Sequence, residues 1–207
     1  MNPDVAWVAF KNSMYIGVVA MVVSTVFGTM LAFVLQRYDF VGKRPFTGIV
    51  YMPIIMPSII MGISALLFFR YVGMTTGIGT TMIAHIAFDI SYVAVIVYAR
   101  LASFNVLLEE ASKTLGANRL ETFRYVTLPN IMPAIVAAAL LAFVLSFDDF
   151  VITFFVVGTK NTLPVYFFGM VRQGIAPGVN VIATLIVLAA SGLVFLAWYL
   201  GGEEVVV

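Results

Sequence analysis

The stretch EEASKTLGANRLETFRYVTLPNIMP, residues 109–133, is the one long polar segment in an otherwise apolar chain. Its residue spacing predicts two short helices joined by a turn. In the first helix the apolar residues recur on one face. Glu109 and Lys113 stand four positions apart on the other face, where we expect them to form an ion pair. Gly116 follows and is expected to end this helix, because glycine readily adopts the backbone of a turn.

The second helix of the segment is predicted to begin at Asn118. Asn118 and Glu121 have the spacing of a capping box, in which two side chains bind the free backbone N–H groups of the first turn. Leu120 and Phe123 then lie on one apolar face, and Pro129 is expected to end the helix. The segment should therefore lie outside the hydrocarbon as two helices, with a mixed apolar and charged surface that suits a soluble partner.

The composition of the whole chain indicates a membrane protein. Hydrophobic residues make up 62% of it and charged residues only 10%, whereas an average soluble domain carries about 25% charged residues. Cysteine is absent, which excludes a disulfide framework and a thiolate metal site, and a net charge of +1 gives no reason to expect a nucleic-acid partner. We expect a single all-α transmembrane domain over residues 1–207, with no metal site.

Five stretches are long and apolar enough to cross a bilayer as helices. Gly17 and Gly28 in the first stretch allow another helix to approach closely. Pro53 and Pro57 in the second remove two intrahelical hydrogen-bond donors, so we expect this span to be kinked or locally unwound. The predicted spans are 13–35, 46–69, 81–99, 131–157 and 179–200.

Basic residues at the ends of the spans predict their orientation. Seven lie on one side and four on the other, and the richer side is expected to be cytoplasmic. This orientation puts the polar segment inside the cell and the amino terminus outside. The seven are Arg37, Lys43, Arg44, Arg100, Lys113, Arg119 and Arg124, and the four are Lys11, Arg70, Lys160 and Arg172.

Glu110, Ala111 and Ser112 are followed at fixed intervals by Gly116, then Val126, Leu128 and Pro129. This spacing resembles the EAA loop of ATP-binding-cassette (ABC) importer permeases, with Ser112 in place of the usual alanine and Val126 in place of the usual isoleucine. In that family the second short helix docks on a cytoplasmic ATPase and passes its closure to the membrane helices. The resemblance implies a coupling loop over residues 105–130. Its expected coupling residues are Glu110, Ala111, Gly116, Asn118, Leu120, Phe123, Leu128 and Pro129.

The same resemblance implies the type I ABC importer permease fold and a multi-pass location in the inner membrane. It also implies three kinds of protein partner: a dimer of cytoplasmic ATPases, a second permease subunit and an extracytoplasmic solute-binding protein. The chain has no P-loop sequence, so we expect it to bind no cofactor and to perform no catalysis, with ATP used by the ATPase. Permeases of this family usually have six spans, with one more before the first span predicted here. Either the chain is truncated at its amino terminus or it is a five-span core.

Asp148 and Asp149 are acidic residues within the predicted fourth span. They follow Ile131 by a distance of roughly 26 Å at 1.5 Å per residue, which puts them near the outer mouth. Adjacent helical positions diverge in direction, so one carboxylate is expected to face the pathway while the other pairs with a donor. A charge inside a membrane is costly and is usually functional. We therefore expect the pair to attract a cationic solute, and the alternative is that it caps a loop or binds a partner subunit.

The motif SFDDFVIT, with the later TLPVYFFGMVRQGIAPGVNVIATL, resembles permeases of the spermidine/putrescine type, and among these the second of their two membrane subunits. Polyamines carry several ammonium groups. Their passage through a low-dielectric path requires carboxylates or aromatic faces to replace hydration. The resemblance therefore implies polyamine import, and the alternative is import of another small solute.

Asp89 lies near the middle of the predicted third span, with His85 four residues before it and Tyr92 three residues after it on one face. One interpretation assigns Asp89 and Tyr92 to the translocation pathway together with the acidic pair. The other, which we favour, is a buried hydrogen-bonded pair of His85 and Asp89 that fixes helix packing.

Three functions other than that of an ABC permease would also suit an apolar membrane chain. A secondary transporter would also use broken helices and acids within the membrane, but the chain has no visible internal repeat and the polar segment would have no explanation. An intramembrane aspartyl protease would require a GxGD sequence around its acids, which is absent. Composition alone does not exclude a membrane scaffold.

Overall fold

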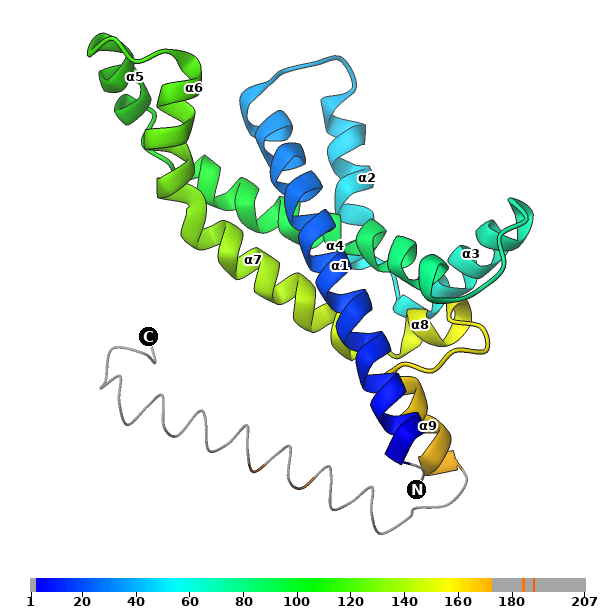
Figure 1. The fold of residues 1–207 in the computed structure, drawn as a ribbon. Helices are drawn as coiled ribbons and strands as arrows, with labels where there is room; N and C mark the ends of the chain where they lie inside the picture. Colours follow the sequence, from blue (N-terminus) through cyan, green and yellow to red (C-terminus); the bar gives the residue numbers. More distant parts are fainter. Residues whose placement is uncertain (1–2, 173–183, 185–187, 189–207) are drawn as a thin grey trace.

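The computed structural model describes residues 3–172 together with residues 184 and 188, and in this part of the chain every regular element is helical. Figure 1 shows long membrane helices with two short helices projecting from one end. Apart from residues 184 and 188, the predicted fifth span, 179–200, lies outside the described residues. The elements are α1 (Pro3–Arg37), α2 (Lys43–Ile55), α3 (Ser58–Tyr71), α4 (Ile78–Ala102), α5 (Leu107–Thr114), α6 (Arg119–Thr122), the π-helical turn η1 (Phe123–Thr127), α7 (Leu128–Asp148), α8 (Val151–Val156) and α9 (Leu163–Arg172).

Helices α1, α4 and α7 pack against one another and form the centre of the molecule. Each lies in a helical stretch that is long and apolar enough to span a membrane: Asp4–Arg37, Ile78–Ala102 and Arg119–Asp148. Glycine permits their close approach, as the sequence predicted. A Cβ atom at Gly28 of α1 would lie 2.6 Å from the Cβ atom of Val93 in α4, and one at Gly17 would lie 3.1 Å from the ring of Phe143 in α7.

The predicted second span is sharply bent, as its two prolines suggested. It consists of α2 and α3, whose axes differ by 109° across a break of two residues, Met56 and Pro57. Pro53 lies inside α2 without ending it, so the break occurs at Pro57. Helix α3 packs against α8, and Gly62 makes room for this contact, since a Cβ atom there would lie 2.6 Å from the ring of Phe155.

The prediction of one continuous fourth span over 131–157 is wrong. Helix α7 ends at Asp148, and α8 begins at Val151 after an extended residue, Asp149. No proline or glycine lies at this break. The carboxylate of Asp149 instead accepts hydrogen bonds from the backbone N–H groups at the start of α8, which stabilises a new helix start.

The prediction that Pro129 ends the second short helix is also wrong. The helix that begins at Arg119 continues through Pro129 to Asp148. Proline lacks an N–H group and clashes with the carbonyl four residues before it. Here the wider turn η1 precedes the proline, and the N–H of Leu128 bonds to the carbonyl of Phe123, five residues earlier. The second short helix is therefore continuous with α7, as Figure 1 shows.

Candidate functional site

The coupling loop, residues 105–130, has the two-helix geometry that the sequence predicted. Gly116 has a φ of +95°, a left-handed conformation that suits glycine, and it separates α5 from α6. The side chain of Asn118 accepts hydrogen bonds from the N–H groups of Leu120 and Glu121, both at 3.0 Å. The backbone N–H of Asn118 donates in return to the carboxylate of Glu121 at 2.8 Å. The predicted capping box is therefore confirmed.

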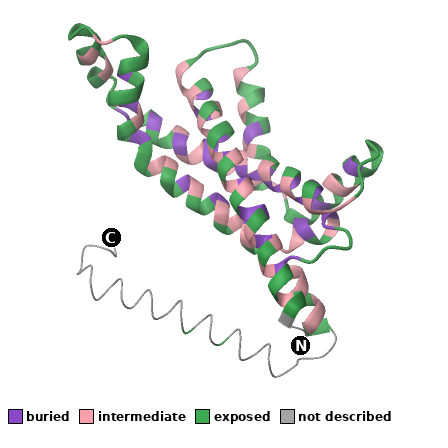
Figure 2. Ribbon diagram, viewed as in Figure 1, coloured by how far each residue is buried: buried purple, intermediate pink, exposed green. Residues whose placement is uncertain are grey.

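The outer surface of the coupling loop exposes large apolar side chains. Leu115 is 89% exposed, Leu120 is 72% exposed and Tyr125 is 70% exposed. Figure 2 shows exposed residues over most of α5 and α6. The predicted coupling residues all lie in this one unit: Glu110, Ala111, Gly116, Asn118, Leu120, Phe123 and Pro129 are exposed, and Leu128 is half-buried.

The inner side of the coupling loop is held together by side-chain hydrogen bonds. Glu109 does not pair with Lys113 as predicted. Its Oε1 atom lies 2.6 Å from Nη2 of Arg37, at the end of α1, and accepts a hydrogen bond from the hydroxyl of Thr127 at 2.7 Å. The hydroxyl groups of Ser112 and Thr122 are 2.9 Å apart. The helices α5, α6 and η1 are thus joined along their inner faces.

A buried polar cluster lies where α7 breaks. His85 of α4 is 1% exposed, and its Nδ1 atom is 2.6 Å from the hydroxyl of Ser146. Its Nε2 atom is 2.9 Å from the hydroxyl of Thr153 and 3.3 Å from the carboxylate of Asp149. The histidine therefore links α4 to α7, to the break and to α8.

The two neighbouring acids at the break have different environments. Asp149 is largely buried and accepts hydrogen bonds from the N–H and hydroxyl groups of Thr153, at 2.8 and 2.9 Å. Asp148 is exposed and has no hydrogen bond or ion pair within the described part of the chain. The carboxylate of Asp149 is thus paired and caps a helix, while that of Asp148 is exposed and unpaired among the described residues.

Asp89 is completely buried, and neither of its carboxylate oxygens has a hydrogen-bond partner among the described residues. The predicted pair of His85 and Asp89 is wrong, because both ring nitrogens of His85 bind groups on α7 and α8. Tyr92 is half-buried, and its ring packs on that of Phe88 with centroids 6.1 Å apart.

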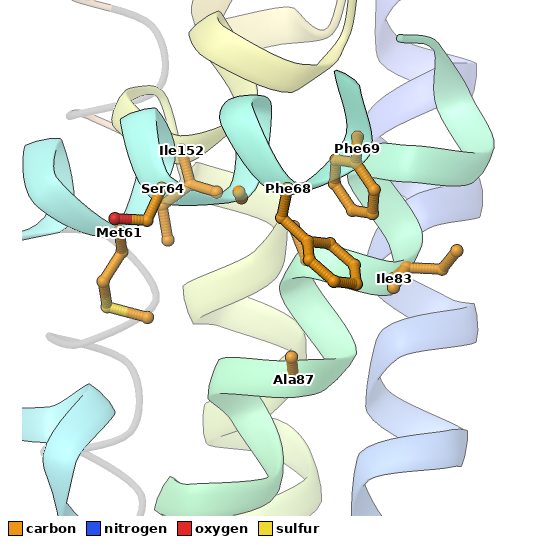
Figure 3. A pocket seen from close by; sticks show the side chains of 9 residues that line it. Met61, Ser64, Phe68, Phe69, Ile83, Ala87 and Ile152 are labelled. Carbon is orange, nitrogen blue, oxygen red and sulfur yellow. The ribbon is translucent and has the colours of Figure 1, made fainter. Parts of the chain in front are cut away.

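An apolar pocket of about 320 Å³ lies between α3, α4 and α8. Figure 3 shows Met61, Phe68 and Phe69 on one side of it and Ile83 and Ala87 on another. Its lining carries no charged side chain. Phe68 and Phe69 could offer aromatic faces to a cation, but no carboxylate lies beside them in the lining to balance its charge.

Several residues of the site were not predicted from the sequence. In the sequence Arg37 contributes only to the charge count at the ends of the spans, and no motif includes Ser146 or Thr153. Arg37 and Glu109 are 72 positions apart, and His85 is 61 and 68 positions from its two hydroxyl partners. No local pattern links residues so far apart. The one local signal was Asp149 followed by Thr153, a carboxylate placed to cap a helix inside an apolar run.

The family model "Binding-protein-dependent transport system inner membrane component" matches residues 24–200 of this chain. The chain therefore belongs to this family of ABC importer permeases of the inner membrane. It is 41% identical to the putrescine transport system permease protein PotI of Escherichia coli strain K12, over 97% of this chain and 74% of the relative. It is 35% identical to the spermidine/putrescine transport system permease protein PotC of Haemophilus influenzae, over 95% of this chain and 77% of the relative.

Two solved structures have the same fold at low sequence identity. One is a bacterial ABC transporter that imports the acidic polysaccharide alginate, with a TM-score of 0.68 and 19% identity over 97% of this chain and 75% of that chain. The other is the MetNI methionine ABC transporter in inward-facing conformations, with a TM-score of 0.68 and 22% identity over 97% of this chain and 96% of that chain. These similarities confirm the expected permease fold.

Proposed function

We propose that this chain is a membrane subunit of an ATP-driven importer and that the coupling loop is its docking site for a cytoplasmic ATPase. One observation carries this proposal: a short loop at the end of the helix bundle exposes Leu115, Leu120 and Tyr125. Apolar side chains gathered on a segment outside the hydrocarbon favour a protein contact. The side-chain hydrogen bonds on the inner side of the loop would let its helices move as one unit when a partner moves them.

The importer would contain this chain, a second permease subunit, two copies of the ATPase and an extracytoplasmic solute-binding protein. The relatives support this assembly because each is named as the permease protein of a transport system. ATP would be bound and hydrolysed by the ATPase subunits. Closure of these subunits would move the coupling loop and, through η1, the cytoplasmic end of α7.

The transported solute is proposed to be a polyamine such as putrescine or spermidine. The names of the relatives support this substrate class, and so does the exposed, unpaired carboxylate of Asp148. Asp149, Asp89 and Tyr92 would form the deeper part of the same path. Asp89 is enclosed in this conformation, so its carboxylate would reach the solute only when α4 separates from its neighbours.

The coupling role is tested with Gly116→Pro in the complete transporter. Proline fixes φ near −65° and cannot reproduce the +95° at this turn. We expect the ATPase to remain active while ATP-dependent uptake of labelled polyamine into vesicles is lost. Gly42→Pro is the matched control, because Gly42 has a φ of +88° in the connection between α1 and α2, outside the coupling loop. Normal coupled uptake in the Gly116 variant would contradict the coupling role.

The acidic pair is tested with Asp148→Asn and Asp149→Asn, made separately. Asparagine at position 149 can still cap α8 through its side-chain oxygen, so the break should keep its geometry. We expect each variant to raise the polyamine concentration that gives half-maximal uptake. Unchanged values in both variants would leave Asp149 with only its capping role and would contradict a role of Asp148 in uptake. Assembly with an active ATPase but without any polyamine uptake would point to another solute.

A further inference from the structure

The last turn of α1 contacts the coupling loop at several points. Arg37 ends α1 and lies 2.6 Å from Glu109 of α5. Its guanidinium group lies 5.9 Å from the ring centroid of Phe104, in the connection between α4 and α5. One turn earlier, Phe33 makes an edge-to-face contact with Phe123 of η1, with centroids 5.5 Å apart. Helix α1 therefore contacts both α5 and η1 of the coupling loop.

A single carboxylate oxygen is at the centre of these contacts. Oε1 of Glu109 is bound by Nη2 of Arg37 and by the hydroxyl of Thr127, so it joins α1, α5 and η1. The side chain of Arg37 is 25% exposed and that of Glu109 is 13% exposed. An ion pair partly shielded from water is weakened less by solvent and salt than an exposed pair. Such an exposed pair, Lys43 with Asp39 at 2.8 Å, lies where the connection between α1 and α2 meets α2.

We infer that Arg37 is a positioning residue that carries the movement of the coupling loop into α1. The inference rests on the proposed function, because it requires an ATPase that moves the loop. The backbone of the loop continues into α7 through η1, whereas the loop contacts α1 through side chains. With the ion pair between Arg37 and Glu109 intact, α1 and α7 move together with the loop. Without it, the loop moves α7 alone and the work of the ATPase is not passed to α1.

The first test measures uptake per ATP hydrolysed by the complete transporter in proteoliposomes. Arg37→Gln and Glu109→Gln should each lower this ratio by about tenfold, which is within the usual range of coupling between sites. The ATPase should still co-purify with both variants. Arg37→Lys retains a charge that can reach Glu109 and should restore most of the ratio, which a loss of packing alone would not predict. Lys43→Gln, which breaks the exposed pair, should leave the ratio unchanged. Wild-type coupling in Arg37→Gln, or an equal loss in Lys43→Gln, would overturn the inference.

A second test does not depend on the transported solute. The chain contains no cysteine, so Tyr38→Cys and Lys113→Cys can carry a pair of spin labels at two exposed positions next to the ion pair. We expect the distance between the labels to stay constant when the transporter is trapped with ATP and vanadate, and to change in the Arg37→Gln background. A change of this distance with Arg37 present would overturn the inference. A constant distance in a transporter that takes up no polyamine would reject the proposed substrate and leave the inference standing.

Discussion

At its Leu128 end, which we expect to be the cytoplasmic end, α7 continues through η1 into the coupling loop, whereas at its other end it stops at Asp148 and the chain starts again as α8. The cytoplasmic end contains Pro129 and stays helical. The other end contains neither proline nor glycine and breaks. The polar contacts at each end account for this difference, because a π-helical turn accommodates the proline and the Asp149 carboxylate stabilises the new helix start.

The polar groups at the two ends of α7 also differ in their exposure to water. At the cytoplasmic end the capping side chain of Asn118 is exposed, and water can replace a lost hydrogen bond there. At the break, the partners of His85 are buried, so a lost hydrogen bond leaves unpaired groups in a low-dielectric interior. The first end should therefore tolerate a lost hydrogen bond better than the second, where α4, α7 and α8 meet.

The largest effect on stability is expected from His85→Ala. This change removes the partner of Ser146 and of Thr153 and leaves a cavity, at a cost of about 3 kcal/mol. Asn130→Ala is the matched change at the cytoplasmic end, where an exposed side chain bonds to the carbonyl of Val126 at 2.7 Å, and it should cost about 0.5 kcal/mol. Thermal unfolding in detergent measures both. Equal losses of stability in His85→Ala and Asn130→Ala would contradict the claim that buried hydrogen bonds at the break contribute more than exposed ones at the other end.

A somewhat smaller effect is expected midway along α1. In Gly28→Ala the new methyl group would lie 2.6 Å from Val93 and 2.9 Å from the carbonyl of Ile90. α1 and α4 must then separate, at a cost of about 2 kcal/mol. Gly48→Ala is the control, because a Cβ atom there meets nothing within 4 Å, and it should stabilise α2 by about 0.5–1 kcal/mol. Unfolding curves in which the two variants behave alike would mean that α1 and α4 do not pack as described.

Loss of the capping side chain in the coupling loop is expected to have a modest effect. Asn118→Ala removes the acceptor for the N–H groups of Leu120 and Glu121 and should destabilise the start of α6 by about 1 kcal/mol. Amide hydrogen exchange should become faster in α6 and remain unchanged in α8. Asn118→Asp keeps an acceptor and should exchange as the wild type does. Faster exchange in α8 as well would show that the two ends of α7 are not independent.

The smallest effect is expected at Asp39, a fully exposed residue. A hydrogen bond from Lys43 and its positive charge hold the pKa of this carboxyl below its usual range. A lowered pKa means that the pair is intact at neutral pH and is lost only as the pH falls through the lowered value. Asp39→Asn should therefore leave stability and uptake unchanged between pH 6 and pH 8, compared in parallel with the wild type. A measurable loss in this range would mean that exposed pairs also contribute to coupling.

Proline and glycine positions predicted some of these features and missed others. The bend at Pro57, the close contact at Gly28 and the turn at Gly116 follow from steric rules that act within a few residues. Pro129 has the same local chemistry as Pro57 but does not end its helix. The difference arises because η1 is held by its contacts with α1 and α5, and such distant contacts are not visible in a local pattern.

The ion pairs and the break show the same limit. A carboxylate four residues before a lysine predicted a pair of Glu109 with Lys113, but Arg37 offers a less exposed partner across the fold. Hydropathy predicted an uninterrupted span through Asp148 and Asp149, because two acidic residues change the mean hydropathy of such a long apolar stretch only slightly. The local spacing of the family motif predicted the position of the coupling loop and of the turn at Gly116. It gave no information about the side chains beneath the loop.

The energy source of transport tests the proposed function most directly. The purified transporter in proteoliposomes would be given labelled putrescine or spermidine while ionophores abolish all ion gradients. With ATP on the side of the ATPase, we expect uptake to continue, and a non-hydrolysable analogue should stop it. Uptake that needs no ATP and disappears with the ionophores would identify a secondary transporter and contradict the assignment of the coupling loop to an ATPase.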